Sequence, residues 1–342
     1  MKRQQHESIL GRAATLKDVA AAANVSPYTV SVVLNGSKSN TRVSPETRER
    51  ILQASARLGY QPNMLARSLK RRSTNIIGLY FGYGHLEPHD PFHAEVLTGL
   101  QRGCEDHSKD LMIHYSFNRS GLDELFAELV GGKIDGLVLI AAPGDPLVER
   151  IREHGLPAVA MTDAINGLPS VIADDAGGSV SIARHLVDRG HRTALYRMCP
   201  GPSDSASRRY SAFCEESARL GLNVVSATTE SWKGEVSNQE SQLIQDRAKH
   251  GITAAVCWGD PSANELLRYC KVHRIAVPQD LAIVGFNGIE PSVEPARRLT
   301  TVKAYWSGVA QRAVSLLTDR LEGRVPPILT VLSTEFVIGD TT

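Results

Sequence analysis

Residues 15–36, TLKDVAAAANVSPYTVSVVLNG, have the spacing of two short helices joined by a tight turn. Thr15 and Asp18 are placed to form a capping box at the start of the first helix. Asn24 follows its last apolar position, and asparagine tolerates the left-handed conformation in which many helices end. Ser26, with proline after it, is typical of a new helix start. The stretch therefore predicts a helix-turn-helix, an element that reads DNA.

The second helix is expected from Pro27 to Leu34, with Val30, Val33 and Leu34 facing inward. The outward positions near its N-terminus are those that a recognition helix presents to base edges, namely Tyr28, Thr29, Ser31 and Val32. Taken alone, this pattern also fits an ordinary amphipathic helical hairpin. A third capped helix is expected to begin at Ser44-Pro45 and to stop at Gly59. Its apolar positions are Ile51, Leu52, Ala54, Ala56 and Leu58.

Three motifs in fixed order make a resemblance to a known family specific. They are TLKDVAxxAxVSxxTVSxVLN from Thr15, RVSPETRERI from Arg42 and LGYxPNxxARSL from Leu58. Through them, and through the region behind them, the chain resembles the LacI/GalR family of bacterial transcription regulators over nearly its whole length. The resemblance implies an N-terminal all-α helix-turn-helix module and an α/β sensor domain with two lobes. That sensor is expected to be similar to periplasmic binding proteins, with parallel sheets and three crossovers.

Four segments are expected along the chain. Residues 1–14 are predicted to be a flexible tail, 15–61 the DNA-binding domain, 62–75 a hinge helix with its linker, and 76–342 the effector-binding and dimerisation domain. Within the last segment, lobe 1 is expected to take about 76–187 and 299–325, and lobe 2 about 188–298 and 326–342. In this division the strand near Leu299 and the following helix return to lobe 1, and residues 328–337 close lobe 2.

The hinge segment, Asn63 to Leu69, spans about two helical turns, and helices shorter than ~12–15 residues are marginal alone in water. The resemblance implies that two such hinges pair in the minor groove, where Leu69 opens a central base step. We therefore expect a homodimer on a pseudo-palindromic DNA operator, without the C-terminal coiled coil that makes some relatives tetrameric. The full set of expected DNA contacts is Thr15, Ser26, Tyr28, Thr29, Ser31, Val32, Asn35, Arg42, Asn63, Ala66, Arg67, Leu69 and Lys70.

The net charge of +1 conceals an uneven distribution. Residues 1–75 hold 13 Lys and Arg against 4 Asp and Glu, a net +9, which leaves −8 for the remainder. A positively charged N-terminal region followed by a negatively charged remainder concentrates the attraction for DNA in the N-terminal region. No apolar run approaches the ~20 residues of a membrane span, and the polar opening has no signal-peptide core. The protein is therefore expected in the bacterial cytoplasm, associated with the nucleoid. Five cysteines without a C-x-x-C pair predict reduced, mostly packed thiols.

From Ile76 onward, short apolar strands alternate with helices, which predicts parallel sheets. The expected strands are 76–81, 111–116, 136–140, 158–161 and 171–173 in one lobe, and 191–196, 224–225, 254–258 and 281–286 in the other. Ligands of such sheets bind beyond the carboxyl ends of the strands. Family correspondence points there to effector contacts at Phe92, His93, Asp163, Arg209, Trp258, Asp260 and Asn287. Aromatic, acidic, basic and amide groups together suit a sugar.

Each of these positions also has an ordinary structural interpretation. Arg209 is then a surface cation, Asp260 a helix N-cap and Trp258 part of the core. The ligand interpretation takes Asp260 as an exposed acid of the cleft, whose truncation leaves the core intact. His85, His89 and His93 have the spacing of metal ligands on a helix, but two prolines among them interrupt such a helix, so no metal is expected.

The sequence contains none of the familiar nucleotide-binding or hydrolase motifs, so neither catalysis nor a cofactor is expected. A sugar-binding transport protein and a sugar-modifying enzyme remain as alternatives. The favoured function is a transcription regulator, a repressor, whose operator affinity is controlled by a small polar effector, a sugar or sugar derivative, bound between the lobes. No membrane partner is expected.

Overall fold

The computed structural model describes residues 14–35, 42–62, 68, 71, 73–84, 86–87, 89–113, 121–289 and 298–342. The chain divides into two compact units, residues 1–74 and 75–342, and each is described by itself.

The first unit is built from three helices around a small apolar core. They are α1 (Leu16–Ala23), α2 (Pro27–Asn35) and α3 (Pro45–Arg57). The capping box of Thr15 and Asp18 forms, and Asn24 ends α1 in the left-handed region at φ 52°. Both local predictions are confirmed. The buried core residues are Val19, Ala20, Ala23, Val30, Val33, Ile51 and Ala54.

The apolar side of α3 is narrower than the sequence predicts. Ile51 and Ala54 are buried, whereas Leu52 and Leu58 are 51% and 37% exposed and Ala56 is exposed as well. Leu52 and Ala56 stand one turn apart on the helix face that lies away from the core. These two apolar positions are therefore not part of the core, since apolar side chains also occur singly on protein surfaces.

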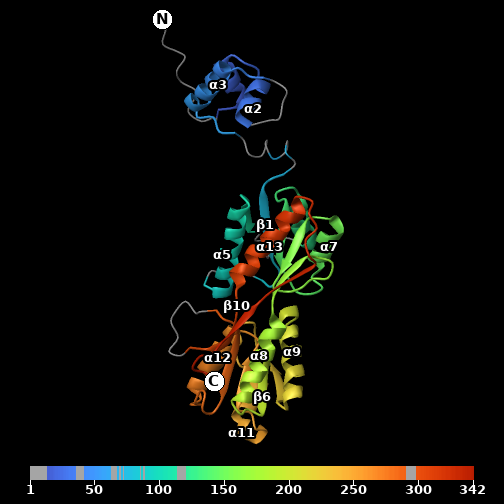
Figure 1. The fold of residues 1–342 in the computed structure, drawn as a ribbon, viewed down its shortest axis with the longest axis vertical. Coiled ribbons are helices and arrows are strands. Elements are labelled where there is room, and N and C mark those ends of the chain that lie inside the picture. The colour runs from blue at the N-terminus through green and yellow to red at the C-terminus, as the bar shows by residue number, and fades with distance from the viewer. Residues whose placement is uncertain are drawn as a thin grey trace. The chain divides into compact units, whose positions relative to one another are not determined.

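The second unit contains two six-stranded sheets, one in each lobe (Figure 1). Lobe 1 has the strand order β11-β5-β4-β3-β1-β2, and lobe 2 has β12-β10-β9-β8-β6-β7. The strands of lobe 1 are β1 (Ile76–Phe81), β2 (Asp110–Ile113), β3 (Gly136–Ile140), β4 (Ala158–Met161), β5 (Ser170–Ala173) and β11 (Leu329–Leu332). Those of lobe 2 are β6 (Thr193–Met198), β7 (Asn223–Thr228), β8 (Ala254–Cys257), β9 (Ala282–Asn287), β10 (Thr300–Ala304) and β12 (Thr334–Val337). Strand β12 runs antiparallel to β10, and the other strand pairs of the described residues are parallel.

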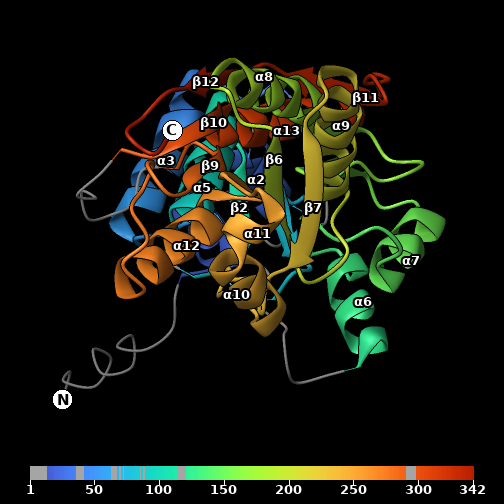
Figure 2. The same ribbon diagram turned by 90° about the horizontal axis from the view of Figure 1, so that it is seen from below.

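Helices cover both faces of each sheet, which is why strands such as β3 are apolar throughout. In lobe 1, α5 (Pro91–Asp106) and α13 (Trp306–Leu321) cover one face, and α6 (Leu122–Val130) and α7 (Pro146–His154) the other. In lobe 2, α8 (Asp175–Asp188) and α9 (Asp204–Leu220) lie opposite α10 (Asn238–Gln245), α11 (Arg247–His250) and α12 (Asp260–Val272), as Figure 2 shows.

The chain passes between the lobes three times, as predicted, but the predicted assignment of segments to lobes was wrong in three places. Helix α8 belongs to lobe 2, where Ile182 and Leu186 pack with Phe213 of α9. Strand β10 pairs with β9 in lobe 2, and β11 pairs with β5 in lobe 1. A local apolar pattern predicts that a strand exists but carries no information on which sheet it joins.

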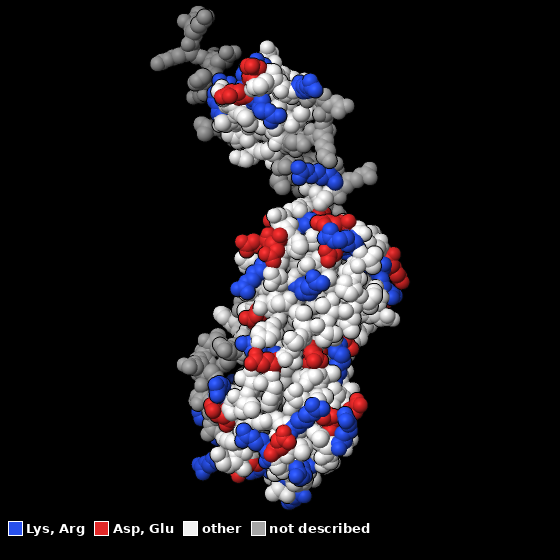
Figure 3. Space-filling model, in the orientation of Figure 1, with Lys and Arg blue, Asp and Glu red and all other residues white. Residues whose placement is uncertain are grey.

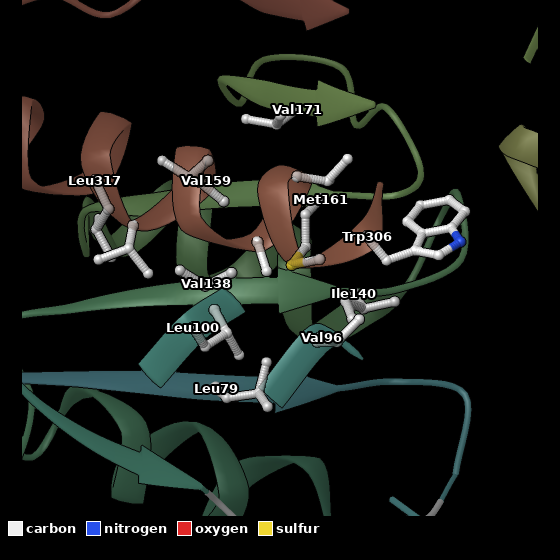
Figure 4. Packing of buried hydrophobic residues seen from close by; sticks show 14 of the residues in the cluster. Leu79, Val96, Leu100, Val138, Ile140, Val159, Met161, Val171, Trp306 and Leu317 are labelled. Carbon is white, nitrogen blue, oxygen red and sulfur yellow. The ribbon is translucent and has the colours of Figure 1, made fainter. Parts of the chain in front are cut away.

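Helices α5 and α13 both contribute to the core of lobe 1, part of which Figure 4 shows, and two glycines allow their close approach. A Cβ atom on Gly99 would overlap the carbonyl oxygen of Ser307, and one on Gly103 would lie 2.8 Å from the Cβ of Val314. The two helices therefore fix each other's N-terminal ends, which carry Phe92 and Trp306.

Charged side chains of both signs are interspersed over the visible face of the second unit (Figure 3). All five cysteines are free thiols. Burial raises the pKa of the Cys104, Cys257 and Cys270 thiols to about 11. Within the described part of the chain, no helix has the length and apolar character needed to cross a membrane.

Candidate DNA-reading surface and ligand cavity

The N-terminal end of α2 carries the candidate DNA-reading side chains. The hydroxyl of Ser26 accepts a hydrogen bond from the Thr29 amide at 3.1 Å, and the two hydroxyls lie 2.8 Å apart. Thr29 is thus part of the helix cap. Tyr28 is 58% exposed, and Ser31 and Val32 are half-buried. Tyr28 consequently offers the largest exposed surface of this helix turn.

The remaining predicted DNA contacts divide between described and undescribed residues. Thr15 forms the cap of α1, and Arg42 is exposed ahead of α3. The side chain of Asn35 and the hinge contacts lie outside the described residues; the latter are Asn63, Ala66, Arg67, Leu69 and Lys70.

A cavity of about 800 Å³ lies at the carboxyl ends of the strands and is lined by both lobes. It brings together the seven side chains expected to contact an effector, which are Phe92, His93, Asp163, Arg209, Trp258, Asp260 and Asn287. This position agrees with the rule for parallel sheets.

The start of α5 forms the lobe 1 wall of the cavity. Asp90 caps this helix by accepting hydrogen bonds from the amides of Phe92 and His93, at 2.8 and 3.3 Å. The ring nitrogen Nδ1 of His93 lies 3.0 Å from the amide nitrogen of Glu87, which donates to it. The Phe92 ring contacts the Trp306 ring edge-to-face, with 5.1 Å between centroids. Phe92 and His93 are therefore held in place by the protein itself.

Arg209 is 4% exposed and is held on three sides. Its Nε donates to Asp175 at 2.7 Å and its Nη1 to the carbonyl of Trp258 at 2.8 Å. Its guanidinium carbon lies 3.8 Å from the centroid of the Phe286 ring. The interpretation as a surface cation is wrong, because Arg209 is a buried group fixed at the cavity wall.

Asp260 differs from both of its expected roles. It is 2% exposed rather than an exposed acid, and Gly259, not Asp260, is the N-cap of α12. Its carboxylate accepts hydrogen bonds from the Thr301 hydroxyl at 2.6 Å and the Ile289 amide at 2.8 Å. Burial raises its pKa to about 7. Asp260 thus ties α12 to β10 and to the loop after β9, so its truncation would disturb the fold.

Asp163 joins the two lobes beside the cavity. It follows β4 of lobe 1, and its carboxylate accepts hydrogen bonds from Tyr83 and, across the lobes, from the Ser205 amide at 2.6 Å and the Ser203 hydroxyl at 3.3 Å. The amide of Ala164 donates to Asp204 at 2.9 Å. We call this set the interlobe contact.

Thr162 begins the same segment with φ +71°, which is unusual for a β-branched residue. Its carbonyl accepts a hydrogen bond from Arg208 of α9 at 3.1 Å. Arg208 also pairs with Asp175 at 2.6 Å. A backbone conformation that costs of order 1–3 kcal/mol is thus held by lobe 2, beside the cavity.

All three tryptophans of the chain line the cavity. The indole nitrogens of Trp258 and Trp306 and the amide oxygen of Asn287 are buried and have no hydrogen-bond partner among the described residues. Figure 4 shows the Trp306 nitrogen on the side of its ring away from the apolar core. Buried polar atoms of proteins are nearly always hydrogen-bonded, and these three exceptions belong to residues that line the cavity.

Several residues of this cavity were not predicted from the sequence, notably Tyr83, Trp232 and Trp306. Each of them follows the carboxyl end of a strand within a few residues, so the rule that led to Asp163 would have found them as well. Among the described residues no group of three or more His, Cys, Asp or Glu side chains is placed to hold a metal, and His85 lies outside them.

A helix-turn-helix unit followed by two α/β lobes around a cavity defines the class of ligand-responsive DNA-binding regulators. Residues 15–63 match the family of bacterial regulatory proteins described as the lacI family, and residues 183–342 match the periplasmic binding protein-like domain.

Individual relatives agree with these family matches. The HTH-type transcriptional repressor PurR of Salmonella paratyphi B is 28% identical, over 90% of each chain. A transcriptional regulator CelR in complex with cellobiose is 26% identical, covers 96% of this chain and 100% of its own, and superposes with a TM-score of 0.69. A lac repressor dimer bound to operator has the same fold, with a TM-score of 0.81 at 23% identity over 96% and 99% of the two chains.

The chain belongs to the LacI/GalR family of bacterial transcription regulators. It is a DNA-binding regulator with a ligand-binding sensor domain.

Proposed function

We propose that the protein is a repressor whose affinity for its operator is set by a small polar effector, a sugar or sugar derivative, bound in the cavity between the lobes. The repressor role rests on likeness to the PurR repressors, and the effector class on likeness to the CelR–cellobiose complex. The protein acts in the cytoplasm and by binding rather than catalysis, in keeping with a family of transcription regulators.

One observation carries the proposal for the effector. The side chains of Trp258, Trp306 and Asn287, each with one buried polar atom that has no partner among the described residues, line one cavity beside the fixed guanidinium of Arg209. Leaving such an atom unpaired costs roughly 1–3 kcal/mol, so a ligand that pairs with them gains affinity. A sugar combines hydroxyls for these groups with a ring that packs on aromatic faces.

The DNA-binding end acts as a homodimer on a pseudo-palindromic operator. Tyr28, Thr29, Ser31 and Val32 are proposed to face base edges, while Thr15, Ser26, Asn35 and Arg42 position the unit on the backbone. The hinge is proposed to lie in the minor groove, with Leu69 at the central base step and Asn63, Ala66, Arg67 and Lys70 around it.

Coupling between the two ends runs through the angle between the lobes. An effector that touches both lobes favours one arrangement of the interlobe contact, because a ligand shifts an equilibrium only by its difference in affinity for the two states. That arrangement sets the spacing of the two hinges in the dimer. Typical coupling free energies of about 1–3 kcal/mol correspond to roughly 5- to 150-fold in affinity.

The tryptophans provide the direct test of ligand binding. Because all three line the cavity, a bound sugar is expected to change the intrinsic fluorescence and to raise the melting temperature. Asn287→Gly keeps the backbone at φ +115° accessible while it removes the amide. This variant should bind the same sugar more weakly. If it binds every sugar that acts on the wild type equally well, the cavity is not the effector site.

A further inference from the structure

The cavity is lined by more residues than the proposed function uses to hold an effector. Its volume of about 800 Å³ lies high in the range of about 300–1,000 Å³ that encloses drug-sized ligands, more than one hexose ring fills. Part of the cavity lining belongs to α12, whose lining side chains are more exposed farther from its N-terminus. Asp260 at the start of this helix is 2% exposed, whereas the side chains of Glu265 and Arg268 are 25% and 71% exposed.

One face of α12 forms the outer wall. Pro261, Asn264, Glu265 and Arg268 recur at the spacing of a single helix face and line the cavity. Arg268 and Glu265 pair at 3.3 Å, so neither presents an isolated charge. This wall offers an amide, a carboxylate and a guanidinium, which are donors and acceptors suited to hydroxyl groups.

Trp232 also lines the cavity and is 42% exposed, which is unusual for a tryptophan. It is nevertheless held firmly. Its ring meets those of Tyr83 and Trp258 edge-to-face, each at 5.6 Å between centroids. On another side it packs against the backbone of Gly201, where an added Cβ would come within 2.9 Å of the ring.

A buried ion pair holds the loop that carries Trp232. Arg197 is fully buried on β6, and its Nε donates to Glu240 at 2.7 Å. Its Nη2 donates to the carbonyl of Gly234 at 2.9 Å, and its Nη1 to the carbonyl of Ser262 in the first turn of α12. The same guanidinium thus joins the loop to the helix, so both walls of the outer end are set before any ligand arrives.

We infer that this outer end is a second sugar subsite, and that the effector is a disaccharide or a longer glycoside rather than a monosaccharide. A pyranose ring has an apolar C–H face and a hydroxyl edge. The exposed face of Trp232 stacks on the former, and Asn264 and Glu265 bond to the latter. Because the Trp232 side chain is already fixed in the free protein, it loses little conformational entropy when a sugar binds. This inference rests on the proposed function, because it extends the same site.

The test is isothermal titration calorimetry on the full chain with matched sugars. The probes are glucose with cellobiose and maltose, and galactose with lactose and melibiose. We expect one disaccharide to bind at least about tenfold more tightly than its component monosaccharide. Trp232→Ala should remove most of this difference, because it should weaken the disaccharide by a much larger factor than the monosaccharide. Trp232→Phe keeps an aromatic face and should retain most of the difference.

Two controls separate the possible failures. Asn287→Gly, at the inner end, should weaken both sugars of a pair by a similar factor. If Trp232→Ala also weakens both equally, or if the wild type binds both sugars of each pair equally, the second subsite is contradicted while the proposed function stands. If no sugar of either size binds the wild type, the proposed effector class fails and the subsite with it.

Discussion

Asp260 has a buried carboxylate whose pKa burial raises to about 7. Because the folded state then holds the proton more tightly than the unfolded chain, the stability that Asp260 contributes is present at low pH. It is lost as the pH rises from about 4 to about 7. Thr301 can either donate to this carboxylate or accept from its protonated form, since a hydroxyl does both.

We predict that Asp260→Asn, which resembles the protonated form, removes this pH dependence. Relative to the variant, the wild type should lose roughly 1–4 kcal/mol of stability between about pH 4 and 7, at about 1.4 kcal/mol per pKa unit. Melting temperatures of both proteins in a pH series measure the difference. A constant difference across the series, or one that grows in favour of the wild type, would contradict the raised pKa.

A second prediction at the scale of single residues concerns the bases that Val32 can contact. Val32 lies in α2 at a position that is proposed to face base edges, and an apolar side chain cannot donate to guanine. Val32→Arg should shift the preference at one base pair of each half-site by roughly 1–3 kcal/mol. Randomised-site selection with both proteins measures this shift. Identical selected sequences would show that residue 32 faces no base.

The sequence predicted which residues line the cavity better than it predicted their hydrogen-bond partners. All seven expected effector residues reached one cavity, because the carboxyl ends of strands meet there. Their chemistry was less predictable. The carboxylates of Asp163 and Asp260 are bonded by groups far along the chain, such as Ser205 and Thr301, and no local pattern reveals such partners.

At the scale of elements, the packing of α5 on α13 decides where Phe92 and Trp306 enter the cavity. We predict that Gly99→Ala destabilises the fold by about 1–3 kcal/mol, because its methyl group would overlap the carbonyl of Ser307. Gly308→Ala, in α13 itself, is the matched control, since its nearest neighbour would lie 3.9 Å away. That variant should gain up to about 1 kcal/mol from helix propensity. Chemical unfolding measures both, and equal effects would contradict the close approach of the two helices.

Most elements were predictable from the sequence because each has its own local signal. Strands such as β3 and β4 each lie within an apolar run of the sequence, and the turn at Asn24 follows from one residue. The assignment of α8, β10 and β11 to lobes was not predictable in this way. It depends on which of the two similar sheets each segment packs against or pairs with, and this is decided by tertiary contacts rather than by the local sequence.

At the scale of the whole molecule, the proposed DNA binding requires two chains, since one short hinge is marginal alone. We predict a stable dimer. Analytical ultracentrifugation at micromolar concentration should give a single species of twice the 37.2 kDa chain mass. A stable tetramer or a monomer under these conditions would contradict the proposed assembly.

The central claim is that a ligand in the cavity controls the DNA affinity of the N-terminal unit. Its most direct measurement is a titration of a selected operator with and without a saturating sugar, on the wild type and on Asn287→Gly. Asn287 is the suitable position because Arg209 and Asp260 also hold the fold together. The wild type should change its operator affinity by roughly 5- to 150-fold with sugar. At the same sugar concentration the variant should change far less, with a sugar-free affinity near that of the wild type. An equal change in both proteins, or none in the wild type at saturation, would contradict the account.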